Sequence, residues 1–287
     1  PRSRRNRKRT ARINQLVEPY GLTVDYDRDV YPISENARNG SITERHITAA
    51  LANKIIAKYG KGEPLVAFLK REMQLPISPK IEGYLLDEEN PHAMYDLLGV
   101  LKSEFVPKFY IEANEECPHA KEAVGFAREI GAISAYAYLG DVGDSVTGDK
   151  KAQRFEDQYI DELFEAIHEM GFNAVTYMPS RNTMEQLKRI KEYCARYNLM
   201  EISGEDINQP RQSFICKAME NPEFANLFDS TWALIGHELA ATKDLDRSLF
   251  SEASVAKDED ITKRIQTYRQ MGTQEYFFWH GKKNPIM

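Results

Sequence analysis

A strand–helix–strand pattern between residues 174 and 203 constrains the fold of this chain more than any other feature. Ala174 to Met178 is a short apolar run with β-branched residues, which is typical of a buried strand, and Leu199 to Ser203 is a second one. Thr183 and Gln186 between them have the spacing of a capping box. Apolar residues then recur at helical spacing at Met184, Leu187, Ile190, Cys194 and Tyr197. A helical crossover of this length forces the strands to be parallel, so the sequence predicts an α/β fold.

Each of these predicted strands runs into a polar loop. Residues 179–182 follow the first strand, and residues 204–211 follow the second. The second loop carries Glu205, Asp206, Asn208 and Arg211. Parallel α/β sheets and barrels bind their ligands at the edge where the strands end, so we expect a site there.

The same residues resemble the last strands of the PHP (polymerase and histidinol phosphatase) domain. The resemblance rests on Gly171–Val175, Tyr177–Arg181, Glu185–Gln186 and Gly204–Asn208. It implies part of a distorted, seven-stranded, TIM-like β/α barrel, with a metal cluster at its C-terminal mouth that hydrolyses phosphoesters. It also implies that Asp206 is a metal ligand, while Arg181 and Asn208 stand where the family has histidines.

Two other stretches are similar to the same family. Ser41 to Leu51 resembles part of a helical insertion that covers the barrel mouth, and His46 matches a histidine of that insertion. From its position alone, a capping or surface role for His46 stays open. Ala132 to Leu139 predicts a further buried strand, with Tyr138 where the family has a third histidine.

These replacements change the chemistry that the predicted site favours. Asp206 and Glu205 can hold a divalent metal (Mn, Zn, Fe or Mg), but the loss of three imidazoles predicts weaker binding than in the family. Arg181 and Arg211 are permanent, forked cations that suit a phosphate or a carboxylate, and Asn208 and Tyr138 can bind the same substrate. For Asp141, Asp144 and Asp149 we favour a solvated turn over a cation site.

A fourth strand is predicted at Ser230 to Gly236, followed by His237 and Glu238. A histidine beside a carboxylate at a strand end can act as acid and base. Because neighbouring residues on a strand point to opposite faces, only one of the two can enter the mouth, and we favour His237. His237 and His46 are thus the catalytic candidates.

Charge and cysteine usage limit the function classes. The net charge of −6 argues against a general nucleic-acid binder. The arginine-rich first dozen residues favour the exposed start of a helix over a nucleic-acid arm, because no aromatic residues interleave with them. Three scattered cysteines indicate reduced thiols in a cytoplasmic protein, and no apolar run is long enough for a membrane span.

The domain organisation follows from where the strands lie. We predict a mostly helical insertion or cap domain over residues 1–108 and the C-terminal half of a PHP-like barrel over residues 109–287. All four predicted strands follow Gly131, although a barrel needs seven or eight. The sheet would have an open edge, so we expect a missing N-terminal segment or a second copy of the chain to cover it.

Two functions follow as expectations. The first is metal-dependent hydrolysis of a phosphorylated small molecule. The second is a degenerate PHP domain without turnover, which binds a phosphorylated or carboxylated molecule or a partner. A salt-bridged rim, in which Arg181 or Arg211 pairs with Glu205 or Asp206, is the purely structural alternative.

Overall fold

The computed structural model describes residues 1–142, 154–207 and 209–280, and the chain divides into two compact units. The N-terminal unit consists of Pro1–Cys117 together with Gln209–Arg211, and the remainder of the chain forms the C-terminal unit. The chain therefore enters the N-terminal unit twice.

The N-terminal unit is helical, as the sequence predicts. Its helices are α1 (Arg2–Val17), α2 (Glu44–Tyr59), α3 (Glu63–Ala67), α4 (Pro79–Leu86), α5 (Ala93–Val100) and α6 (Val106–Phe109), joined by short 3-10 and π-helical turns. A single apolar core unites them, with Ile13, Leu51, Phe68 and Leu97 almost fully buried. This core lies entirely within the first 109 residues.

The basic start of the chain is the first part of α1, which confirms the predicted helix. Ile13 and Val17 bury its apolar side. Its arginines pair with carboxylates of the same unit: Arg5 with Glu116 at 2.7 Å, Arg4 with Glu115 at 2.7 Å and Arg7 with Asp27 at 2.6 Å. Much of the local positive charge is therefore matched within the fold.

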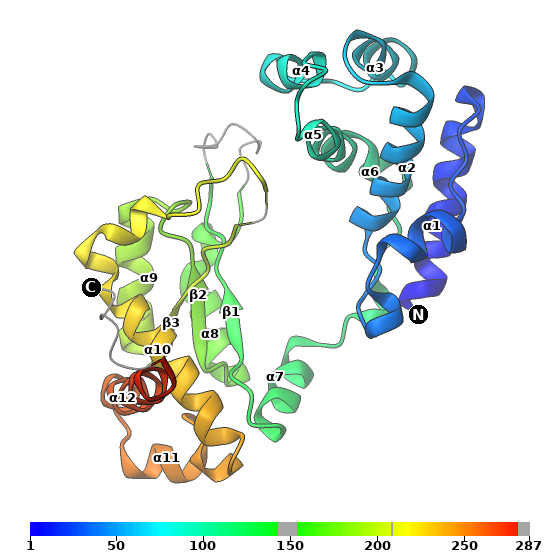
Figure 1. Ribbon diagram of the computed structural model, residues 1–287. Coiled ribbons are helices and arrows are strands. Elements are labelled where there is room, and N and C mark those ends of the chain that lie inside the picture. Colours follow the sequence, from blue (N-terminus) through cyan, green and yellow to red (C-terminus); the bar gives the residue numbers. More distant parts are fainter. Residues whose placement is uncertain (143–153, 208, 281–287) are drawn as a thin grey trace. The chain divides into compact units, whose positions relative to one another are not determined.

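The C-terminal unit contains a parallel sheet in the order β1-β2-β3. The strands are β1 (Ala135–Ala137), β2 (Ala174–Tyr177) and β3 (Met200–Ser203). The helices are α7 (Ala120–Glu129), α8 (Ile160–Met170), α9 (Met184–Arg196), α10 (Ala225–Ala241), α11 (Glu252–Lys257) and α12 (Ile261–His280). Figure 1 shows the three short strands side by side.

Helices cover both faces of this sheet because side chains alternate along each strand. Val175 and Tyr177 share one buried cluster with Phe164 of α8 and Ile190 of α9. Ala174, on the opposite face, belongs to a second cluster that contains side chains of α10 and α12. The result is three layers, helix, sheet and helix.

The predicted barrel is wrong. The described part of the chain has three strands in one small sheet, and this sheet is not closed. Residues 230–236, predicted as a fourth strand, lie inside α10. The error has a physical cause, because a short apolar run cannot distinguish a buried strand from one side of a buried helix.

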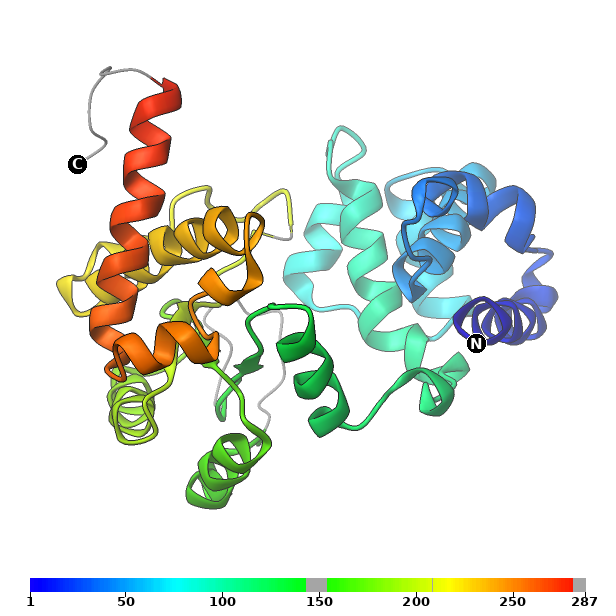
Figure 2. The same cartoon turned by 90° about the horizontal axis from the view of Figure 1, so that it is seen from below.

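α10 and α12 pack against each other at two glycines, and the two helices cross in Figure 2. A Cβ atom added at Gly236 would lie 1.9 Å from the Tyr268 carbonyl oxygen, and one at Gly272 would lie 2.2 Å from the Trp232 carbonyl oxygen. Gly236 is therefore needed for the close approach of the two helices.

Candidate functional site

Glu205 ties together the two loops at the predicted edge of the sheet. The Ser180 amide donates to Glu205 Oε1 at 2.6 Å, and the Ser180 hydroxyl donates to Oε2 at 2.7 Å. The Gly204 amide also donates to the Tyr177 carbonyl at 2.7 Å. Both carboxylate oxygens of this predicted metal ligand are therefore engaged in holding the loops.

The remaining candidates of this edge have separate surroundings. Arg181 donates its Nε to the Leu139 carbonyl at 3.1 Å and lies over the Phe155 ring, 5.7 Å from its centre. Asp206 is exposed in the loop after β3, and its carbonyl accepts a hydrogen bond from Gln212. Asn208 lies outside the described residues, as do Asp144 and Asp149. Arg181 thus lies in the loop after β2 and Glu205 in the loop after β3, and these are the two loops that the Ser180–Glu205 hydrogen bonds join.

Tyr138 is part of a buried hydrogen-bond network after β1. It is 1% exposed, and its hydroxyl donates to Asp157. Gln186 and the Asp141 amide also donate to Asp157, at 2.6 and 3.0 Å. Burial and the neighbouring carboxylate raise the pKa of Tyr138, and the hydrogen bonds to Asp157 outweigh burial and lower the pKa of that carboxyl. Tyr138 is thus a neutral donor that joins β1 to the segment before α8.

The two catalytic candidates belong to different units. His46 lies in the first turn of α2, in the N-terminal unit, where its Nδ1 accepts the Thr43 amide at 3.1 Å and completes a capping box. His237 lies inside α10, is 6% exposed and accepts the Leu249 amide on Nδ1 at 3.1 Å. Burial lowers the pKa of His237, although Glu238 opposes the shift.

The sequence raised the questions of a metal cluster and of a membrane-spanning helix, and the described residues bear on both. Within residues 1–142, 154–207 and 209–280, no three His, Cys, Asp or Glu side chains gather closely enough to hold a metal ion. Among the same residues, no helix combines the length and the apolar character needed to cross a membrane.

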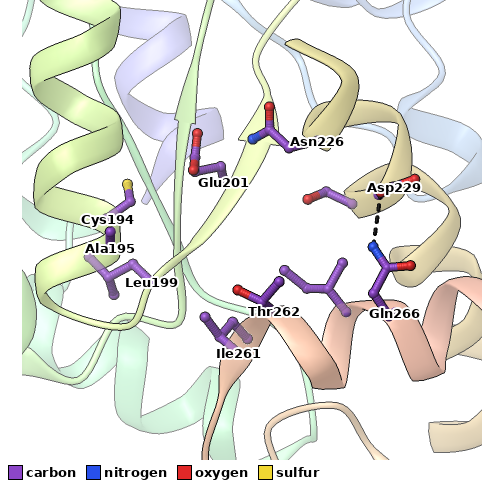
Figure 3. Close-up of a pocket in the computed structure, with 11 residues that line it drawn as sticks. Cys194, Ala195, Leu199, Glu201, Asn226, Asp229, Ile261, Thr262 and Gln266 are labelled. Atoms are coloured by element: carbon purple, nitrogen blue, oxygen red, sulfur yellow. Dashed lines mark hydrogen bonds between the residues drawn. The ribbon is translucent and has the colours of Figure 1, made fainter. Parts of the chain in front are cut away.

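The C-terminal unit has a pocket of about 160 Å³ beside β3, which the sequence analysis missed. Its lining comes from the end of α9 and the start of β3, from the first part of α10 and from the first turns of α12 (Figure 3). The polar lining residues are Cys194, Glu201, Asn226, Asp229, Ser230, Thr262 and Gln266, and the apolar ones are Ala195, Leu199, Ile261 and Ile265. In Figure 3, Glu201 and Asn226 lie opposite Ile261 and Thr262.

Glu201 is the distinctive charge of this pocket. Tyr177 donates its hydroxyl to Glu201 Oε2 at 2.6 Å, and Tyr177 itself is fully buried. Burial, followed by the negative charge of Glu201, raises the pKa of the Tyr177 hydroxyl and of the Cys194 thiol, so both remain protonated neighbours. No Lys, Arg or His of the described chain forms an ion pair with Glu201.

Asp229 differs from Glu201 because its charge is matched. Arg269 of α12 lies 2.7 Å from Asp229 Oδ1, and Gln266 donates to Oδ2 at 3.0 Å. The pocket therefore carries one carboxylate with a cationic partner and one without. The sequence contained a signal for the second, since Glu201 is the one charged residue of the predicted strand Leu199 to Ser203.

The pocket lies along the free edge of the sheet. Among the described strands, β3 pairs with β2 alone, and the Met200 amide donates to the Asn173 carbonyl at 3.0 Å. Main-chain groups of a parallel strand alternate in direction, so those of Glu201 point away from β2. Glu201 thus lines the pocket and also turns its main-chain groups away from β2.

Comparison of this chain with protein-family models, with curated proteins and with solved structures finds no match. The resemblance to the PHP domain stays an expectation, as do the metal, the substrate and the catalytic roles drawn from it.

Proposed function

We propose that the C-terminal unit binds a small organic cation in the pocket beside β3, with the Glu201 carboxylate as its counter-ion. The observation that carries this proposal is that Glu201 lines a pocket in which no Lys, Arg or His is among the lining residues. A partly buried carboxylate without a cation is costly, and a ligand that brings an ammonium group removes that cost.

The lining also supports the size and polarity of such a ligand. An apolar cavity of about 150 Å³ can hold benzene, so a pocket of about 160 Å³ has room for a molecule of roughly that size. Leu199, Ile261 and Ile265 can contact its carbon atoms, while Ser230 and Thr262 offer hydroxyl oxygens to its N–H groups. A phosphate or carboxylate would instead face two carboxylates, Glu201 and Asp229.

Phosphoester hydrolysis and the binding of an anion at the sheet edge remain predictions from the sequence resemblance. Supporting contacts for them are fewer, because Glu205 is hydrogen-bonded to Ser180 and Arg211 belongs to the N-terminal unit.

Titration of the whole chain with n-butylammonium, followed by calorimetry and by NMR chemical shifts, tests the proposal. We expect n-butylammonium to bind and the neutral, equally long 1-butanol to bind at least ten-fold more weakly. A hydrogen bond to a charged group contributes about 1.5–3 kcal/mol, and about 1.4 kcal/mol corresponds to a ten-fold change in affinity.

The decisive variant is Glu201→Gln, which keeps the shape of the side chain and removes its charge. It should weaken n-butylammonium binding at least ten-fold. Glu192→Gln, an exposed position on the same helix that supplies Cys194, changes the net charge equally and should leave binding unaltered. Equal affinity for the amine and the alcohol, or unchanged binding by Glu201→Gln, would refute the proposal.

A further inference from the structure

Arg211 is bound in the N-terminal unit by three side chains that together recognise a guanidinium group. Asp96 accepts Nε at 3.2 Å and Nη2 at 2.8 Å, one bond on each carboxylate oxygen. Asn90 accepts Nη2 at 2.9 Å, and the guanidinium carbon lies 3.8 Å from the centre of the Tyr84 ring. A forked, planar cation can make all of these contacts at once, whereas the compact ammonium of lysine cannot.

The three residues around Arg211, which are Tyr84, Asn90 and Asp96, all belong to the segment Pro1–Cys117 of the N-terminal unit. Asp96 is 5% and Asn90 4% exposed. Asn90 donates its Nδ2 to Asp96 Oδ2 and to the Tyr84 carbonyl, both at 2.8 Å, and its Oδ1 accepts the His92 amide at 2.9 Å. These bonds hold the two acceptors in place without any contribution from Arg211.

Arg211, by contrast, reaches the pocket on a short stretch of chain. Only Gln209–Arg211 of this region belongs to the N-terminal unit, while the residues on both sides belong to the other unit. The Arg211 side chain stays 31% exposed, whereas that of Asp96 is 5% exposed. The site formed by Tyr84, Asn90 and Asp96 is thus occupied by a side chain carried on a short stretch of chain.

We infer that Tyr84, Asn90 and Asp96 form a binding site for guanidinium ligands, which Arg211 occupies as an internal ligand. An arginine side chain of another protein, or a free guanidinium compound, has the chemistry to take its place. A tethered group competes with an effective concentration of the order of mM, so an external ligand binds weakly while Arg211 is present.

The test removes the internal ligand and adds an external one to the whole chain. We expect Arg211→Ala to bind methylguanidinium at least ten-fold more tightly than the unaltered chain, measured by calorimetry and by shifts of the Asn90 side-chain NMR signals. If Arg211→Ala melts at a lower temperature, Arg211→Gln replaces it. The blocked peptide acetyl-Gly-Arg-Gly-amide separates the two sources: tighter binding than methylguanidinium indicates a protein arginine, and equal binding indicates a free guanidinium compound.

Two variants serve as controls. Asp96→Asn added to Arg211→Ala should abolish binding of both probes. Arg196→Ala removes an arginine that also lies over an aromatic ring, Tyr193 at 5.0 Å, and should create no site for methylguanidinium. The inference is overturned if Arg211→Ala binds neither probe more tightly than the unaltered chain. It is also overturned if the double variant, Asp96→Asn with Arg211→Ala, binds the probes as tightly as Arg211→Ala alone.

Discussion

At the scale of single residues, burial decides what the histidine of α10 can do. His237 was expected to project from a strand end, but it lies within a helix and accepts the Leu249 amide. An imidazole that accepts on Nδ1 and is 6% exposed favours its neutral form. Protonation of His237 is therefore expected to lower the stability of the folded chain.

We predict that His237 makes the fold less stable in mild acid. Its pKa is below the ordinary value of 6.5, chiefly because of burial, whereas in the unfolded chain it is ordinary. The unfolded state therefore binds more protons below about pH 6.5, and the free energy of unfolding falls from there down to the folded pKa. His237→Asn, which retains an acceptor for Leu249, should reduce the loss of stability between about pH 7.5 and about pH 5.5 in urea titrations.

His119 offers a matched control because it is exposed. His119→Gln should leave the pH dependence as it is. An identical pH dependence in His237→Asn and the unaltered chain would contradict the prediction.

At the scale of elements, the two glycines between α10 and α12 hold the helices at their short separation. Gly236→Ala and Gly272→Ala should each lower the free energy of unfolding by about 1–3 kcal/mol, because each new methyl group meets a main-chain carbonyl that cannot turn away. Gly125→Ala in α7 meets nothing within 4 Å and should stabilise the chain by up to about 1 kcal/mol. Urea unfolding measures all three, and a stabilising Gly236→Ala would disprove the packing argument.

The same elements show what the sequence could predict. The strand, helix and strand between residues 174 and 203 were predicted correctly, since local apolar periodicity and the Thr183–Gln186 capping box are both contained in a short stretch of chain. Residues 230–236 were predicted wrongly. The packing role of Gly236 depends on Tyr268, which lies in contact with it but far away in the sequence. Likewise, nothing local to Arg211 indicates that its partner is Asp96.

At the scale of the whole molecule, the Asp96–Arg211 pair predicts opposite effects of one substitution. In the whole chain, Asp96→Asn leaves the Arg211 guanidinium without its carboxylate and should lower stability by about 1–3 kcal/mol. In a fragment of residues 1–117, which retains the complete N-terminal apolar core, Asp96 has lost Arg211, so Asp96→Asn should raise the melting temperature. Thermal melting of the whole chain and of the fragment, each with and without Asp96→Asn, checks this. A change in melting temperature of the same sign in both would argue against the prediction.

The route of the chain also has a consequence for synthesis. Asp96 leaves the ribosome long before Arg211, because more than a hundred residues separate them. The Asp96 carboxylate therefore leaves the ribosome before the guanidinium that pairs with it in the finished chain.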